Sequence, residues 1–152
     1  MQIDARLMHT AFELAAELAR FSGDGIGAVV SFTGVARGTA RDGTKVTGLY
    51  VDHHPRLTQR SLEQAAQSAA ARFELLALQI LHRCGEIAPG EPIVFVAAAA
   101  AHRRAAFDAV DYLMDRLKTD AVFWKREDAV DGSRWIEPTE GDRADRARRS
   151  DR

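Results

Sequence analysis

The stretch YLMDRLKTDAVFWKREDAVDGSRWIEP, residues 112–138, decides the fold because its apolar pattern changes from helical to extended within a few residues. Its first part ends a helix, since apolar side chains recur three or four residues apart at Val110, Leu113, Met114 and Leu117. This spacing places Lys118 in the last helical turn, where exposed carbonyl groups favour a cation.

The second part of the stretch predicts a β-hairpin. Residues 122–124 favour a strand, Asp131 and Gly132 form a turn signal, and residues 134–136 resume strand character, with a loop longer than two residues between the strands. On the first strand Lys125 and Glu127 share one face, and Arg126 lies on the other. Either lysine alone is ordinarily a solvated side chain, but the whole constellation favours a functional site.

The rest of the chain predicts several short strands and two further helices, without strict alternation between them. Thr10 and Glu13 form a capping-box pattern that predicts a helix ending near residue 22. Strands are expected at residues 28–33, where Gly34 interrupts the pattern, and at 45–52, 75–83 and 92–100, with an alanine-rich helix at 58–73. Hairpin-like succession of strands favours an α+β fold over a doubly wound parallel sheet. We expect one domain at residues 1–137, then a charged tail at 138–152 with too few apolar residues to add much core.

Composition excludes several classes of protein. Hydrophobic residues at 46% and charged residues at 28% are ordinary for a globular chain. The formal charge of -1, from 21 basic and 22 acidic residues, provides no global field for nucleic acid or an anionic membrane. No apolar run approaches the roughly 20 residues of a membrane span, and the first ten residues lack the apolar core of a signal peptide. The single cysteine, Cys84, excludes an internal disulfide and fits a reducing compartment, so we expect a cytoplasmic protein.

Cationic residues gather at the predicted ends of elements. Arg37 follows a strand in a loop rich in glycine and arginine, and His102 and Arg103 lie where a strand gives way to a helix. Free amides and the helix dipole at such a position favour an anion. Each residue alone is more often a surface side chain. Together with Lys118, Lys125 and Glu127, they predict a site for a phosphate-bearing ligand.

Common catalytic motifs are absent from the sequence. It has no GxSxG elbow, Walker loop, Rossmann glycine pattern or HExxH pair. The adjacent His53 and His54 point to opposite faces of an extended chain and have no nearby cysteine or histidine to complete a tetrahedral set, so we expect neither to bind a metal. Cys84 is interpreted as a buried thiol rather than a nucleophile. These absences favour a nucleophile that arrives on a partner.

Five segments resemble the large, catalytic subunit of molybdopterin synthase: GAVVSFTGVAR, LHRCGEIAPGE, VFVAAAAAHR, LKTDAVFWKRE and DGSRWIE, within residues 27–137. The resemblance implies an α/β-hammerhead fold with a largely antiparallel sheet and packed helices. It also implies a sulfurtransferase that converts cyclic pyranopterin monophosphate into molybdopterin by adding a dithiolene, without a metal or organic cofactor. The sulfur donor is the C-terminal Gly-Gly thiocarboxylate of a small ubiquitin-like subunit, and the large subunit forms a homodimer within a heterotetramer.

The resemblance also assigns roles by position. Val35, Ala36 and Arg37 match the substrate-binding loop, and His102 and Arg103 match a phosphate-binding pair that can belong to the pocket of a neighbouring protomer. Lys118 matches the lysine beside the partner's tail, where it can stabilise negative charge. Lys125, a second catalytic lysine able to transfer protons, begins a substrate-contacting segment that continues through Arg126 and Glu127.

Two alternatives stay open at this point. One is a docking module that binds the small subunit or a phosphate ligand without turnover, although such a scaffold has no need of two lysines. The other is an unrelated enzyme that acts on a phosphate ligand without a protein partner. Product formation with and without the carrier distinguishes these alternatives from the synthase.

Overall fold

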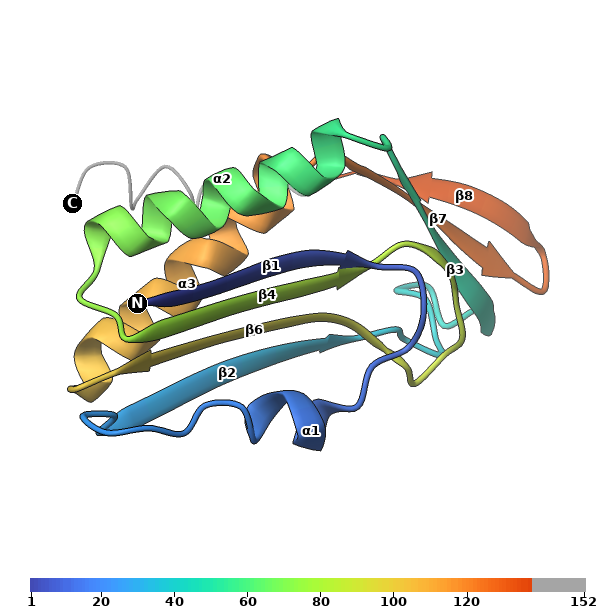
Figure 1. Ribbon diagram of the computed structural model, residues 1–152. Coiled ribbons are helices and arrows are strands. Elements are labelled where there is room, and N and C mark those ends of the chain that lie inside the picture. Colours follow the sequence, from blue (N-terminus) through green and yellow to red (C-terminus); the bar gives the residue numbers. More distant parts are fainter. Residues whose placement is uncertain (138–152) are drawn as a thin grey trace.

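The structure, a computed structural model, describes residues 1–137, so the tail predicted at residues 138–152 lies outside the described residues. Its larger layer is a four-stranded sheet (Figure 1). The first two strands in the sheet are parallel and the other neighbours are antiparallel. The order across this sheet is β1 (Gln2–Met8), β4 (Ala77–Arg83), β6 (Pro92–Ala100) and β2 (Ala28–Val35).

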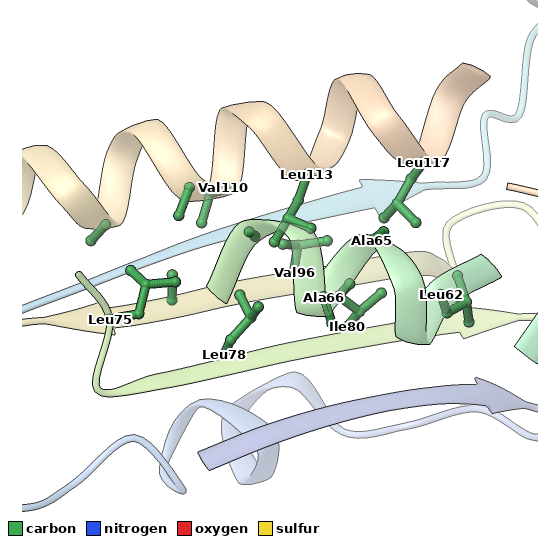
Figure 2. Packing of buried hydrophobic residues seen from close by; sticks show 14 of the residues in the cluster. Leu62, Ala65, Ala66, Leu75, Leu78, Ile80, Val96, Val110, Leu113 and Leu117 are labelled. Atoms are coloured by element: carbon green, nitrogen blue, oxygen red, sulfur yellow. The ribbon is translucent and has the colours of Figure 1, made fainter. Parts of the chain in front are cut away.

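Two long helices, α2 (Leu57–Arg72) and α3 (Arg103–Thr119), cover one face of this sheet. Figure 2 shows Leu113 and Leu117 of α3 pointing into the layer formed by α2 and the strands. Alternate residues of β6, such as Val94 and Val96, face these helices, as a strand's period of two requires. Small alanine side chains on α2 and β6 let the layers approach closely, and this fixes the path of α3.

The opposite face of the sheet is covered by the segment between β1 and β2. Phe12 packs there against Leu81 and Phe95. The predicted helix from residue 10 is wrong in extent, because α1 spans only Leu14–Leu18. Its N-cap is Glu13, whose extended backbone makes no side-chain cap hydrogen bond, so the capping box does not form.

A second sheet lies at one end of the first (Figure 1). All its neighbours are antiparallel, in the order β5 (Gly85–Ile87), β3 (Val46–His53), β7 (Phe123–Ala129) and β8 (Gly132–Ile136). The predicted hairpin is confirmed as β7 and β8. Its loop is shorter than predicted, because pairing continues to Ala129 and Gly132 and leaves only residues 130–131 between the strands.

The predicted fold class is confirmed: the chain is a mixed α+β domain with mainly antiparallel sheets and packed helices. The strand predicted at 28–33 continues through Gly34, where a Cβ atom would lie 2.8 Å from Val94 Cγ1. The sheet register shifts after this glycine, so it marks a bulge rather than an end of the strand. Within residues 1–137, no helix has the length and apolar character needed to cross a membrane.

Candidate active site

The predicted substrate loop begins at the end of β2, beside the second sheet (Figure 1). Val35 and Arg37 are exposed, whereas Ala36 between them is buried in a small cluster with Val51 and Ile87. The Ala36 amide donates to the Glu91 carbonyl at 2.9 Å, and its carbonyl accepts from the Gly90 amide at 2.8 Å. Two hydrogen bonds therefore hold the backbone at Ala36, and Arg37 is the next residue.

The Glu91 turn that holds this loop is itself held by Arg83. The Arg83 guanidinium is buried and forms an ion pair with the Glu91 carboxylate, and it also donates to the Glu86 carbonyl at 3.0 Å. Hydrogen bonding from Arg83 lowers the pKa of Glu91. The ion pair thus connects β4 to the base of the loop that carries Arg37.

Helix α3 separates two groups of predicted residues. His102 is its N-cap and makes no side-chain cap hydrogen bond, and Arg103 is its first residue. Both are exposed, as is Lys118 in the last turn. Lys118 follows His102 by sixteen positions, which correspond to about 24 Å along the helix axis. Lys118 therefore lies at the end nearer the second sheet, and His102 and Arg103 lie at the far end (Figure 1).

Strand β7 carries Lys125, Arg126 and Glu127 with the predicted alternation of faces. The Arg126 guanidinium lies 4.9 Å from the ring centroid of Tyr50 and 5.9 Å from that of Trp135, and its Nε donates to Asp128 at 2.8 Å. Glu127 accepts from Arg134 Nη2 at 2.9 Å. Arg126 and Glu127 are thus held in place by their neighbours on opposite faces of the hairpin.

Lys125 lies opposite Val51 of β3, on the face turned toward the first sheet. Its charge acts on His82, a buried residue of β4 that the sequence analysis did not single out. Burial, then the Lys125 charge, lowers the pKa of His82 to about 3. Its Nδ1 lies 2.8 Å from the Arg83 carbonyl, which only accepts, so Nδ1 carries the hydrogen of the neutral ring.

His82 also joins the two sheets. Its ring is stacked on Phe123 at a centroid distance of 3.8 Å and an interplanar angle of 20°. In the sequence, His82 is marked only as a lone histidine within an apolar strand. Its relation to Lys125 becomes visible only when β7 packs onto β4. The neutral ring gives Lys125 a polar neighbour without adding a second positive charge.

The two adjacent histidines have different environments. His54 accepts backbone hydrogen bonds at the start of α2, with Nδ1 3.1 Å from the Leu57 nitrogen. His53, in contrast, lies near His9 and Cys84, although the sequence pattern indicated no nearby cysteine or histidine. That expectation is wrong because the ends of three strands, far apart in the chain, meet at this point.

One chain therefore brings together only part of the predicted site. The loop after β2, the C-terminal end of α3 and strand β7 lie at the end of the first sheet that adjoins the second sheet (Figure 1). These elements carry residues 35–37, Lys118 and residues 125–127. His102 and Arg103 do not join them, because the length of α3 intervenes.

Comparison with known proteins identifies relatives of this arrangement. The chain matches the MoaE protein family over residues 7–120. A molybdopterin synthase catalytic subunit of Pseudomonas aeruginosa is 48% identical over 141 residues, covering 91% of this chain and 93% of the relative. The corresponding subunit of Caulobacter vibrioides is 52% identical over 125 residues, covering 80% and 79%.

Solved structures agree with the sequence relatives. The structure of molybdopterin cofactor biosynthesis protein E from Burkholderia multivorans superposes with a TM-score of 0.80 at 36% identity, covering 99% of this chain and 98% of that one. Fold and relatives define the class as a catalytic enzyme subunit of molybdopterin biosynthesis. The chain belongs to the MoaE protein family, and the family resemblance found in the sequence is confirmed.

Proposed function

We propose that this subunit transfers sulfur to cyclic pyranopterin monophosphate and so forms the dithiolene of molybdopterin. The sulfur comes from the C-terminal Gly-Gly thiocarboxylate of a small ubiquitin-like subunit. At each of the two substrate carbons a bond to sulfur replaces a bond to oxygen. The carrier's carbonyl carbon loses its bond to that sulfur and gains one to the oxygen of a water molecule, so it leaves as a carboxylate, and two carriers are consumed for each dithiolene. The description of the relatives as catalytic subunits supports both the activity and a further subunit.

The observation that supports the proposal is that the loop after β2, the C-terminal end of α3 and strand β7 lie at the same end of the first sheet (Figure 1). Arg37, Lys118 and Lys125 belong to these three elements. The hydrogen-bonded backbone at Ala36 fixes the point from which Arg37 extends. The guanidinium of Arg37 suits an anionic substrate. Lys118 is exposed at a helix C-terminus, where an extended tail can reach it. We assign it the stabilisation of negative charge on the thiocarboxylate during transfer.

Lys125 has a different environment and a different proposed role. It is partly buried on β7, opposite Val51, and its charge reaches the neutral His82. A lysine held among apolar groups suits proton transfer better than a fully solvated one. Arg126 and Glu127, with their side chains held by neighbours, shape the substrate-binding segment around it.

The separation along α3 supports a homodimer whose sites are shared. His102 and Arg103 lie about 24 Å along the helix from Lys118. We assign these two residues to the phosphate of a substrate bound by the second protomer. With one small subunit for each large one, the assembly is a heterotetramer. The cytoplasmic location expected from the sequence stays a prediction.

Reconstitution tests the proposal. The full chain, a thiocarboxylated ubiquitin-like partner and cyclic pyranopterin monophosphate are mixed, and the dithiolene product is detected by mass. Product that requires the carrier supports the synthase. A stable complex without product favours the docking module, and turnover without a carrier favours an unrelated enzyme acting on a phosphate ligand.

A further inference from the structure

Three metal-ligating side chains meet at a place that the proposed sulfur transfer does not use. His9 follows β1, His53 ends β3, and Cys84 lies between β4 and β5. We propose that His9, His53 and Cys84 bind a divalent transition metal of the zinc class, with the fourth position open to water. This site is independent of the proposed transfer, which needs no metal.

The distances suit a single ion. Cys84 Sγ lies 3.3 Å from His9 Nδ1, and one ligating atom from each of the three residues lies within 4.8 Å of the other two. A tetrahedral zinc with Zn–S of about 2.3 Å and Zn–N of about 2.1 Å places a sulfur and a nitrogen about 3.6 Å apart. The Cys84 and His9 atoms are already near this spacing, and the remaining separations, within 4.8 Å, would shorten when an ion binds.

The orientation of the two imidazoles agrees with shared coordination. The rings of His9 and His53 are 5.6 Å apart between centroids, with an interplanar angle of 73°. Two imidazoles bound to one tetrahedral zinc have centroids about 5 Å apart, calculated from the same bond lengths. The pair is therefore placed as ligands of one ion, rather than stacked face to face.

The donor chemistry selects the class of metal. One thiolate and two imidazoles favour zinc and other late transition metals over magnesium or calcium, which prefer oxygen ligands. Cys84 is buried, and its Sγ lies within reach of His9 Nδ1 and of the Met8 carbonyl. A bound cation supplies the charge that stabilises the thiolate there. Exposed His9 provides the route by which an ion enters.

A metal at this position would connect the two sheets. His9 and Cys84 adjoin strands of the first sheet, whereas His53 belongs to β3 of the second. His53 is paired in register with Phe123 of β7, two residues before Lys125. Binding would therefore brace the strand pair that carries Lys125 against the first sheet.

Cobalt provides the test, because a cobalt–thiolate bond produces a charge-transfer band that histidine ligands alone do not. The reduced, full-length protein is treated with a chelator, desalted and titrated with Co²⁺, and then with Zn²⁺. We expect one Co²⁺ per chain, a thiolate charge-transfer band, and loss of that band as Zn²⁺ displaces cobalt. Cys84→Ser should abolish the band, and His9→Ala and His53→Ala should each weaken Co²⁺ binding at least about tenfold.

The matched control is His54→Asn, which alters the neighbouring histidine and keeps an acceptor for the backbone of α2. It should leave the band and the affinity unchanged. His9 is exposed, so we expect His9→Ala to keep the fold intact. Circular dichroism checks the fold of every variant. Absence of a charge-transfer band in the wild-type protein, or equal weakening by His54→Asn, would overturn the site.

Discussion

The imidazole of His82 and the ring of Phe123 are stacked 3.8 Å apart, and this contact joins β4 of one sheet to β7 of the other. The histidine is buried and neutral, with its Nδ1 hydrogen directed at the Arg83 carbonyl. A charged imidazolium at this position would be desolvated and would face the charge of Lys125. Protonation of the His82 imidazole would therefore weaken this contact between the sheets.

Stability should consequently fall in acid, in part through His82. Its pKa in the folded chain is about 3, against 6.5 for an unperturbed histidine, so the unfolded chain takes up the proton first as the pH falls. The stabilising contribution is complete above pH 6.5 and is lost progressively toward pH 3. Urea unfolding of the wild-type protein and His82→Gln should show a shallower pH dependence in the variant. Parallel curves would contradict a buried, neutral His82.

Lys118→Ala should reduce dithiolene formation by about 100-fold or more, the scale of losing one group that stabilises developing charge. Because Lys118 is exposed, folding and association with the small subunit should persist, as judged by size-exclusion chromatography. Lys45→Ala, which changes another exposed lysine, is the control and should retain wild-type turnover. Normal turnover by Lys118→Ala would remove the assigned role.

Mixed dimers test whether a site is shared between protomers. Arg103→Ala and Lys118→Ala should each be inactive alone, whereas an isolated heterodimer of the two contains one intact site and should recover about half of the wild-type activity. A heterodimer of Lys118→Ala and Lys125→Ala should stay inactive, because both lysines serve the same site of one chain. No recovery in the first mixture would contradict the division of the site along α3.

The packing of α3 can be tested on two of its faces. Leu113 is fully buried against α2 and the sheet, so Leu113→Ala should lower the free energy of unfolding by about 2–5 kcal/mol. Phe107 is 55% exposed on the same helix, so Phe107→Ala should cost well under half as much. Chemical denaturation measures both variants. Similar losses would contradict the assignment of the buried face.

Much of the fold could be predicted because its central elements have strong local signals. The long helices α2 and α3 follow apolar spacing, and the apolar run of β6 indicates a central strand, which it is. Strand β1 was missed although Ile3, Ala5 and Leu7 alternate with polar residues. Strand β5 has only three residues, too few for a period, and exists because it pairs with β3.

The sequence marks candidate site residues, but it does not predict their arrangement in space. Arg37, Lys118 and Lys125 stand beside turn and helix-end signals in their own segments, so local patterns locate them. Two relationships depend on how the separate sheets pack. The charge of Lys125 acts on His82, and His53 lies close to Cys84. No local pattern encodes these distances, whereas the separation of His102 from Lys118 follows from the helix that the sequence predicts between them.

The unbroken form of α3 limits how this chain can change in length. Each residue inserted between Arg103 and Lys118 would advance the lysine by about 1.5 Å and turn it by about 100° around the axis, away from the second sheet. The loop at residues 41–43, by contrast, lies at the surface and can lengthen without moving either group. Insertions and deletions among functional homologues should therefore collect in such loops, while the count of residues from Arg103 to Lys118 stays constant.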